Sequence, residues 1–227
     1  MLLLRAMKKK LTLFDLDHTL LTGDSDVLWC DFLIQRGILD RVEFSARNAE
    51  MEARYKAGTV RVREFTEFYV STLTGRTPQE WEPLRREFLE QEIVPRIPAN
   101  ARQLVEQHLV SADLVAMTTA TNRYITELTA DHLRIEHLIA SEPEVIDGCF
   151  TGRTSGTLNM REGKVVRLHA WLASRAVSIA DFEVTAFSDS INDLPLLLAA
   201  DHPVAIDPDE KLMAWAVENS HPVLRLR

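Results

Sequence analysis

The sequence predicts an α/β fold with a parallel sheet and, within the same chain, an inserted all-helical subdomain. Short apolar runs alternate with helical patterns from residue 100 onward, which is typical of βαβ units and a parallel sheet. Between residues 25 and 92 the apolar residues instead fall at helical spacing, without strand-like alternation. An apolar run at residues 11–14 ends in aspartates, and we expect it to be a buried strand of the sheet.

The composition is that of a folded globular protein with an acidic surface. The 227 residues allow one large domain or a core with a smaller insert, and 46% hydrophobic with 26% charged residues argues against disorder. The net charge of -8 disfavours nucleic acid as a principal partner, because a polyanion would be repelled. A small phosphorylated metabolite is compatible if a metal and a few cations gather positive charge locally.

The sequence favours neither a zinc site, a disulfide, a membrane span nor a signal peptide. Cys30 and Cys149 lie far apart without CxxC spacing, so we expect two buried thiols in a reducing cytosol. No apolar run approaches the length of a membrane span. The N-terminal MLLLRAMKKK lacks the long apolar region and the cleavage site of a signal peptide. Met7 is an alternative translation start. We expect a cytoplasmic protein without membrane contact; the sequence predicts no oligomeric state.

Two carboxylates follow the first predicted strand, within LTLFDLDHTLL at residues 11–21. In open α/β sheets ligands sit just past the carboxyl ends of the strands, and Asp is poorly suited to a strand interior. Asp15 and Asp17 are therefore candidates for a hard-metal site with a carboxylate nucleophile. The alternative is a surface turn rich in Asp and Thr, and this stretch alone does not decide between the two.

Four helices are expected in the insert, and each has a start or stop signal. The first helix is expected to start at Ser25 and to end at Gly37, and the second, residues 41–57, to end at Gly58. The third is expected to end at Gly75. The fourth is expected to start at Thr77, with Pro78 at its first position. Pro95 and Pro98 mark the return to the α/β part. We expect a core domain of residues 1–22 and 96–227 and a helical subdomain of residues 23–95.

The α/β part resumes with a helix that we expect Asn100 to cap. The expected strands lie at residues 114–118, 139–141, 184–187, 204–206 and 223–224, and the expected helices at 123–133, 164–175, 193–199 and 211–217. Residues 144–156 are rich in Gly and Thr and are expected to form a β-excursion.

Two further segments combine a strand end or a helix start with polar side chains. In MTTATN, residues 117–122, Thr119 offers a hydroxyl and nearby backbone N–H groups to an anion, unless the threonines only cap the next helix. Lys164 follows Gly163 at the start of a helix, where it opposes the helix dipole. A phosphate or a carboxylate cluster is expected to hold this lysine, unless it is simply solvated.

A last candidate segment is FSDSINDLPLL at residues 187–197. Asp189 and Asp193 are four residues apart, so a turn leading into a helix brings both to one side, with Asn192 beside them. N-capping by Asp189 or Ser190 is the simpler explanation, but it leaves the second carboxylate and the amide without a role.

One explanation covers all of these segments. Asp15, Asp17 and Asp189 would be clustered carboxylates, which repel one another unless a cation is bound. Oxygen ligands with open positions suit Mg²⁺, and Thr119 and Lys164 would then bind the remaining phosphate oxygens. The sequence thus predicts a phosphoryl-transfer site.

In order and spacing, DLDHT, TTATN, Gly163–Lys164 and SDSIND resemble the four motifs of the haloacid dehalogenase (HAD) superfamily of aspartyl-phosphate phosphohydrolases. The chain is most similar to subfamily IB, which contains phosphoserine phosphatase, and the resemblance covers essentially the full length. It implies a Rossmann-like HAD core with a parallel sheet and an inserted C1-type helical cap. It also implies a Mg²⁺-dependent phosphatase that acts on a small phosphorylated metabolite.

The resemblance assigns roles to the motif residues. Asp15 would be the nucleophile, and Asp17 the general acid and then the general base. The carboxylates of Asp15 and Asp189 and the backbone carbonyl of Asp17 would bind Mg²⁺. Asp193 would orient Lys164 or a metal-bound water.

For the phosphate, the resemblance implies contacts from Thr119 and Lys164, with Asn192 contacting the phosphate or the metal shell. Thr118 is an alternative to Thr119 as the phosphate-binding hydroxyl. The fourth motif departs from the family, because serines at positions 188 and 190 stand where glycines are common.

In the implied cap, Asp24 matches an acidic residue that contacts the substrate's amino group in phosphoserine phosphatases. Tyr69 stands where a carboxylate-binding arginine is expected, with Arg61 and Arg63 as nearby substitutes. An unpaired substrate carboxylate is costly to bury, so this departure disfavours phosphoserine itself. A phosphomonoester with an amine and no carboxylate, such as histidinol phosphate or phosphoethanolamine, is the competitor.

Three other functions share parts of the pattern. A phosphotransferase or mutase would use the same aspartyl-phosphate, and the sequence does not separate it from a phosphatase. A nucleotide-sugar transferase also uses a DxD motif but gives no role to Lys164 or to Asp189 and Asp193. A binding protein without activity is disfavoured because every expected catalytic residue type is present.

Overall fold

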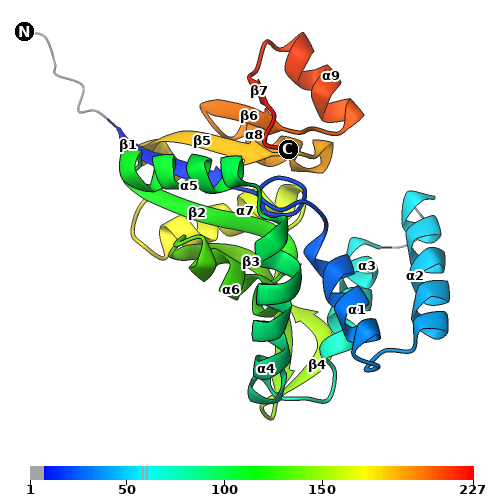
Figure 1. Ribbon diagram of the computed structural model, residues 1–227. Helices are drawn as coiled ribbons and strands as arrows, with labels where there is room; N and C mark the ends of the chain where they lie inside the picture. Colours follow the sequence, from blue (N-terminus) through cyan, green and yellow to red (C-terminus); the bar gives the residue numbers. More distant parts are fainter. Residues whose placement is uncertain (1–7, 58, 60) are drawn as a thin grey trace, which may run out of the picture.

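The computed structural model describes residues 8–57, 59 and 61–227, and its centre is a β-sheet (Figure 1). The strands are β1 (Lys9–Phe14), β2 (Leu114–Asn122), β3 (His137–Ile146), β4 (Cys149–Ser155), β5 (Phe182–Ser188), β6 (His202–Ile206) and β7 (Val223–Leu224). The described residues place them in one seven-stranded sheet with the order β4-β3-β2-β1-β5-β6-β7. Neighbouring strands run parallel except β3 and β4, which are antiparallel. The predicted α/β fold with a parallel sheet is confirmed.

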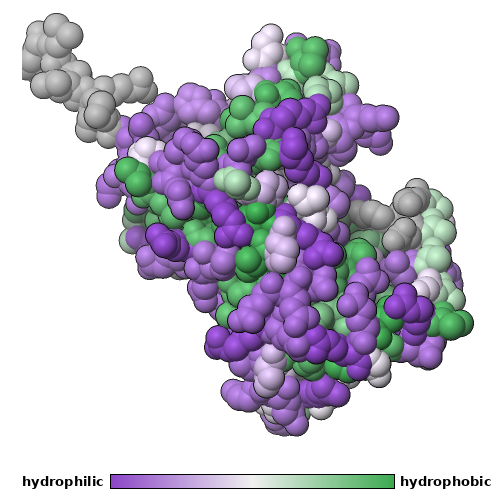
Figure 2. Space-filling view, viewed as in Figure 1, coloured by the Kyte–Doolittle hydropathy of each residue, from purple (hydrophilic) through white to green (hydrophobic). Residues whose placement is uncertain are grey.

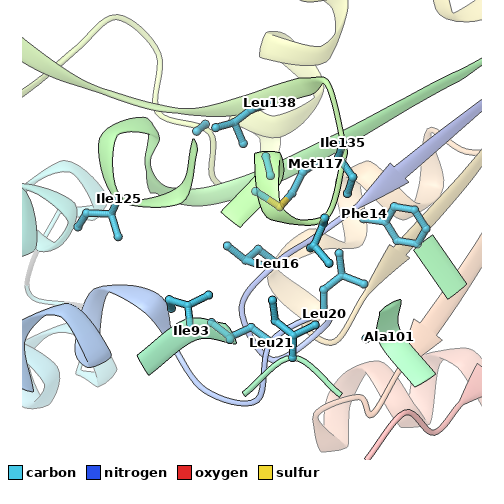
Figure 3. Packing of buried hydrophobic residues seen from close by; sticks show 14 of the residues in the cluster. Phe14, Leu16, Leu20, Leu21, Ile93, Ala101, Met117, Ile125, Ile135 and Leu138 are labelled. Atoms are coloured by element: carbon cyan, nitrogen blue, oxygen red, sulfur yellow. The ribbon is translucent and has the colours of Figure 1, made fainter. Parts of the chain in front are cut away.

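Helices cover both faces of this sheet. They are α5 (Ala99–Ser111), α6 (Arg123–His132), α7 (Glu162–Ala173), α8 (Leu194–Leu198) and α9 (Glu210–Glu218). In β1, Leu11 and Leu13 point into the core under α7, α8 and α9. Phe14 points to the opposite face, into the core under α5 and α6 (Figure 3). Both faces of β1 are therefore buried, which explains its nearly continuous apolar run.

The strand order reverses at β1, and this places the DxD segment at the middle of the sheet. β1 pairs with β2 on one side and with β5 on the other. Such a switch point leaves a crevice beyond the carboxyl ends of the strands. Asp15 follows β1 directly, and its backbone N–H donates to the carbonyl of Phe187 at 3.0 Å. The sheet itself thus fixes where this carboxylate lies.

The segment between β1 and α5 is helical, as predicted. Its elements are α1 (Ser25–Gln35), α2 (Arg41–Lys56), α3 (Val62–Val70), the 3₁₀ turn η1 (Ser71–Leu73), α4 (Pro78–Phe88), the π-helical turn η2 (Leu89–Ile93) and the 3₁₀ turn η3 (Val94–Arg96). Thr77 and Glu80 form the capping box that starts α4, with Pro78 at its first position. Gly58, the predicted end of α2, lies outside the described residues.

Two predicted helix caps were wrong. Asp24, not Ser25, caps α1, because its side chain accepts from the backbone N–H groups of Asp26 and Val27. Pro98, not Asn100, occupies the cap position of α5, since proline's fixed φ suits the entry to a helix. For α1, Asp24 and Ser25 are adjacent residues that can both cap a helix, and in the structure the helix starts after Asp24.

Several expected elements are longer or differently built in the structure. β2 continues beyond residue 118 to Asn122, with a shift in its pairing to β3 between Thr119 and Asn122. The helix expected at residues 193–199 is divided into the 3₁₀ turn η5 (Ile191–Asp193) and α8. The threonines of this segment also suit a helix cap by themselves. In the structure, pairing with β3 keeps them in the strand.

The expected β-excursion is the antiparallel hairpin of β3 and β4, at the edge of the sheet, and it packs against the helical insert (Figure 1). Its strand β4 lies against α3 and η1. Gly152 approaches η1 so closely that a Cβ there would lie 2.2 Å from Thr74 Oγ1. The hairpin therefore connects the α/β part to the insert.

The surface in Figure 2 is mainly hydrophilic, with hydrophobic residues in small groups. Within the described part of the chain, none of the helices has the length and apolar character needed to cross a membrane.

Candidate active site

A pocket of about 270 Å³ lies at the carboxyl ends of β1, β2 and β5, next to the helical insert. Its lining residues are Asp15, Asp17, His18, Asp24, Asp26, Phe65, Thr66, Tyr69, Ala120, Thr121, Met160, Lys164, Asp189, Ser190, Asn192 and Asp193. All of the predicted site residues except Thr118 and Thr119 are in this set. Segments from four distant parts of the sequence therefore meet at one edge of the sheet, as the strand order requires.

Lys164 lies at the base of the pocket between two carboxylates. Its Nζ is 2.7 Å from Asp15 Oδ1 and 2.6 Å from Asp193 Oδ2, and only 2% of its side chain is exposed. Burial by itself lowers the pKa of the Lys164 amine, but the two carboxylates raise that pKa by more, so the amine stays charged. The carboxylate cluster expected around this lysine is present.

The loop before α7 brings Lys164 to this position. Arg161, just before α7, adopts a positive φ of 53°. Gly163 packs against the backbone so closely that a Cβ would lie 2.1 Å from the carbonyl oxygen of Leu158. Lys164 is the third residue of α7, so the loop and the first turn together direct its side chain into the pocket.

Both carboxylate oxygens of Asp15 are engaged. Oδ1 accepts from Lys164, and Oδ2 accepts from Thr19 Oγ1 at 2.8 Å. Burial raises the pKa of Asp15 to about 6, although the charge of Lys164 opposes this shift. At neutral pH the carboxylate is therefore ionised and held in one orientation, as a nucleophile must be.

Asp17 lies beside Asp15 with its carboxylate directed differently. Its Oδ1 accepts from the N–H and the hydroxyl of Ser25, at 2.7 and 2.6 Å. Its Oδ2 accepts from Thr121 Oγ1 at 2.9 Å and from Thr119 Oγ1 at 3.3 Å. Burial and the charge of Asp24 raise the pKa of Asp17 to about 6, and the hydrogen bonds from Ser25 limit that rise. A carboxyl with this pKa exchanges its proton near neutral pH.

Asp189 is the third carboxylate of this group and is partly buried. Thr19 Oγ1 lies 3.3 Å from Asp189 Oδ1, so this hydroxyl stands between Asp15 and Asp189. Burial and then the charges of Asp15 and Asp193 raise the pKa of Asp189 to about 8. The Asp189 carbonyl accepts from the backbone N–H of Asp209 at 2.8 Å, which ties the loop after β5 to the segment that starts α9.

The serine at position 188, one of the two departures from the expected glycines, has a structural role. Ser188 Oγ donates to Asp193 Oδ2 at 2.8 Å, the same oxygen that contacts Lys164. Ser188 is fully buried, so its hydroxyl supports the carboxylate from the side away from the solvent. Asp193 is thereby held toward Lys164.

Thr118 and Thr119 point in opposite directions, as successive strand residues do. Thr119 Oγ1 is directed at Asp17, whereas Thr118 Oγ1 accepts from Asn159 Nδ2 at 2.9 Å. Neither side chain lines the pocket; Ala120 and Thr121, from the irregular end of β2, do. Of the two threonines, only Thr119 has its hydroxyl beside the carboxylates.

The insert contributes an acidic and aromatic wall. Asp24 and Asp26 come from the start of α1, and Phe65 and Tyr69 from α3. Thr121 Oγ1 lies 3.3 Å from Asp26 Oδ2, and burial raises the pKa of Asp26 well above its ordinary value.

The two arginines proposed as substitutes for the one missing at position 69 do not line this pocket. Arg63 instead donates to the carbonyls of Thr154 and Gly156 on the far side of α3. Lys164 is the only lysine or arginine among the described residues of the lining.

Comparison with known proteins agrees with this geometry. The family model of haloacid dehalogenase-like hydrolases matches residues 12–198. This chain belongs to that family. Over 221 residues it is 36% identical to a histidinol-phosphatase of Neisseria meningitidis serogroup C (strain 8013), an alignment that covers 96% of this chain and 100% of the relative.

Two further relatives support the assignment. A phosphoserine phosphatase of Mycobacterium tuberculosis (strain ATCC 25618 / H37Rv) is 28% identical over 94% of this chain and 70% of its own. The solved structure of a protein of unknown function from Bordetella pertussis Tohama I is 40% identical and superimposes with a TM-score of 0.94, covering 97% of this chain and 100% of that one. The HAD-like hydrolase described here is thus a phosphatase with the HAD fold.

The donor set of this HAD-like hydrolase suits a hard cation. Asp15, Asp189 and the backbone of Asp17 offer oxygen only, the ligand type that Mg²⁺ prefers. Across residues 8–57, 59 and 61–227 there is no group of three His, Cys, Asp or Glu side chains arranged to hold a metal ion by themselves. Mg²⁺ keeps several waters and commonly binds only one or two carboxylates, so two carboxylates and a carbonyl fit it.

Sequence reasoning missed several residues that shape the site in this HAD-like hydrolase. Ser25 and Thr121 hold the Asp17 carboxylate, and Asn159 connects the motif segments beneath it. Thr121 lies inside the TTATN motif, so its position near Asp17 follows from the sequence only if β2 is extended to Asn122. Asn159 gives no signal of its own, because its partners are reached only after the loop folds onto β2 and β3.

Proposed function

We propose that this phosphatase hydrolyses a small phosphomonoester with the help of Mg²⁺, through an aspartyl-phosphate formed on Asp15. The observation that carries the proposal is the position of Asp15. Its carboxylate is fixed by Lys164 and Thr19 at the pocket floor, with the carboxyl of Asp17 beside it. A positioned nucleophile next to an exchangeable proton is the arrangement that phosphoryl transfer to a carboxylate needs.

In the first step a carboxylate oxygen of Asp15 forms a bond to phosphorus while the bond to the leaving alcohol oxygen breaks. Asp17 gives its proton to that oxygen and becomes a carboxylate. In the second step Asp17 takes a proton from water as the water oxygen attacks phosphorus, and the Asp15 carboxylate is released with inorganic phosphate. The raised pKa of Asp17, about 6, suits both transfers near neutral pH.

The carboxylates of Asp15 and Asp189 and the backbone carbonyl of Asp17 would hold Mg²⁺, with Asp193 nearby. When bound, the ion neutralises charge on the phosphate and the carboxylates. Lys164 supplies a second positive charge to the phosphate, and Asp193 keeps its amine in place.

For the phosphate oxygens we propose Thr119 rather than Thr118, because the Thr118 hydroxyl is engaged by buried Asn159. Ala120 lines the pocket directly after Thr119, and the Asn192 side chain lines it from η5. These residues would surround the phosphate opposite Asp15.

For the leaving group we propose an alcohol that carries a cationic amine and no carboxylate. Asp24 and Asp26 line the pocket from the start of α1, and Asp24 would provide negative charge for the amine. Phe65 and Tyr69 provide aromatic surface. A substrate carboxylate would meet no arginine among the described lining residues, which disfavours phosphoserine. A relative 36% identical over nearly the whole chain carries the name histidinol-phosphatase, and histidinol phosphate has this chemistry.

The division of labour follows from the same pattern. Residues 1–22 and 96–227 would form the catalytic core, and residues 23–95 the cap that selects the leaving group. The cap side of the pocket carries Asp24, Phe65 and Tyr69, and the core side carries the four motif aspartates and Lys164.

The test is phosphate release from L-histidinol phosphate, phosphoethanolamine, L-phosphoserine and acetyl phosphate, with Mg²⁺ or with EDTA, for the wild type and Asp15→Asn. We expect release that needs Mg²⁺, is highest on L-histidinol phosphate, and is lost in Asp15→Asn. Release without metal or full activity of Asp15→Asn would overturn the mechanism. Highest activity on L-phosphoserine would overturn the substrate class alone.

A further inference from the structure

Helix α3 presents different side chains on two sides. Phe65, Thr66 and Tyr69 line the pocket. Arg63 and Glu67, one helical turn apart, contact β4 of the hairpin instead. The same helix therefore forms a wall of the pocket and, on its other side, is attached to the α/β part of the molecule.

The attachment centres on one buried threonine. Thr154 Oγ1 accepts from Arg63 Nη1 at 2.6 Å and donates to Glu67 Oε1 at 2.9 Å. The Thr154 backbone N–H also donates to Glu67 Oε1, at 3.0 Å, and its carbonyl accepts from Arg63 Nη1 at 3.1 Å. Thr154 is only 7% exposed. Hydrogen bonds to charged groups are stronger than neutral ones. The threonine is shielded from water, whereas 46% of the Arg63 side chain and 25% of the Glu67 side chain are exposed.

Two more contacts fix the same hairpin to the chain that follows α3. The backbone N–H of Gly75 donates to the carbonyl of Phe150, and the N–H of Phe150 donates to the carbonyl of Arg76. Gly152 packs directly against Thr74. Elsewhere in the insert, α1 and α4 pack on α6, but the core element against which α3 packs is β4. The position of α3 over the pocket thus depends on the hairpin.

We propose that Thr154 is a positioning residue. Through its hydrogen bonds to Arg63 and Glu67 it holds α3 over the pocket and so sets the affinity for the leaving group. This proposal rests on the proposed function, because it assigns the leaving group to the wall that α3 forms.

The expected kinetic effect depends on the fraction of molecules in which α3 lies over the pocket. If only a fraction of molecules has α3 in place, the apparent dissociation constant rises by the inverse of that fraction. A substrate that contacts Phe65 and Tyr69 restores the placement once bound, so its kcat is unaffected. A substrate too small to reach α3 gains nothing from the placement, and its KM is independent of Thr154.

The test compares Thr154→Val, which keeps the shape but loses the hydroxyl, with the wild type. Thr154→Ser, which keeps the hydroxyl, is the rescue, and Thr151→Val on the same strand is the matched control. We expect Thr154→Val to raise KM for L-histidinol phosphate about tenfold, the effect of losing charge-assisted hydrogen bonds, with kcat within about twofold of wild type. KM for acetyl phosphate stays unchanged, and both other variants behave as wild type.

Hydrogen exchange of the substrate-free protein gives a readout that needs no activity. We expect amides of residues 62–70 to exchange faster in Thr154→Val, and those of β1 to exchange as in the wild type. An unchanged KM for L-histidinol phosphate, or an equal rise for both substrates, would overturn the proposal. If the wild type does not hydrolyse L-histidinol phosphate, the proposed substrate class fails, and the exchange of residues 62–70 alone decides whether Thr154 positions α3.

Discussion

Lys164 and Asp15 form a buried ion pair, with 2.7 Å between Nζ and Oδ1, although 149 residues separate them in sequence. β1 places Asp15 at the centre of the sheet, and the first turn of α7 carries Lys164 to it. Asp193 approaches the same amine at 2.6 Å, so one cation is shared by two carboxylates. A buried charge that loses its partner is costly, so we expect stability to depend on this lysine.

We expect Lys164→Met to lower both the stability of the protein and its rate of phosphate release. Without the amine, Asp15 and Asp193 face each other with no cation between them. The free energy of unfolding should fall by about 3 kcal/mol, in the range measured when one member of a buried pair is removed. Phosphate release should fall by about 100-fold or more, because the phosphate loses its positively charged partner. Urea unfolding and steady-state phosphate release measure the two effects.

Lys211→Met is the control, since Lys211 is exposed on α9 and is not one of the residues that line the pocket. It should leave both quantities near the wild-type values. Wild-type phosphate release by Lys164→Met would show that the amine has no part in the reaction.

A second prediction concerns the pKa of Asp17. Ser25 Oγ donates to Asp17 Oδ1 at 2.6 Å, and a hydrogen bond to the ionised form keeps a carboxyl pKa lower than burial alone would set it. Ser25→Ala removes that donor, so the pKa of Asp17 rises further above its present value of about 6. The limb of the pH–rate profile that reports Asp17 should therefore move to higher pH by about one unit.

The pH dependence of kcat between pH 5 and 9 measures this shift, with Ser174→Ala at the exposed end of α7 as the control. Because the ionised form is the one destabilised, a movement of the limb to lower pH is incompatible with the contact described. An unmoved limb would mean that another group controls it.

Much of the site was predictable because its residues lie where strands end. An apolar run followed by Asp15 and Asp17, and another followed by Asp189, indicate a switch point without knowledge of side-chain positions. The carboxyl ends of parallel strands meet at one edge, so adjacency in space follows from topology alone. The predicted α/β fold was confirmed for the same reason.

The residues that sequence reasoning missed act across distances that no local pattern encodes. Asn159 lies in an irregular loop, and its hydrogen bonds are with β2 and β3. Ser25 was predicted to cap α1, but the chain turns so that Asp24 caps it and the Ser25 hydroxyl reaches Asp17. Both residues have ordinary local explanations, and only the folded chain shows that they contact the site.

Asn159 is the subject of a third prediction. Its Nδ2 lies 2.9 Å from Thr118 Oγ1, from the carbonyl of Thr119 and from the carbonyl of Ile139, in a fully buried position. Asn159→Ala removes the donor that these acceptors share, and a buried acceptor left unsatisfied costs about 1–3 kcal/mol. We expect a loss of about 3 kcal/mol in the free energy of unfolding, measured in urea. Asn100→Ala, at an exposed position of α5, should cost well under 1 kcal/mol by the usual size of surface substitutions.

The last prediction separates backbone strain from close packing in the hairpin. Gly148 and Gly152 have nearly the same positive φ, +80° and +82°. A Cβ at Gly148 would meet nothing within 4 Å, whereas one at Gly152 would lie 2.2 Å from Thr74 Oγ1 and 3.2 Å from Ser71 Cα. Gly148→Ala therefore tests the cost of a positive φ alone, about 1 kcal/mol. Gly152→Ala adds the cost of forcing β4 away from η1, and we expect about 3 kcal/mol in total. Urea unfolding of the two variants gives the difference directly, and equal costs would mean that the hairpin does not press against the insert in solution.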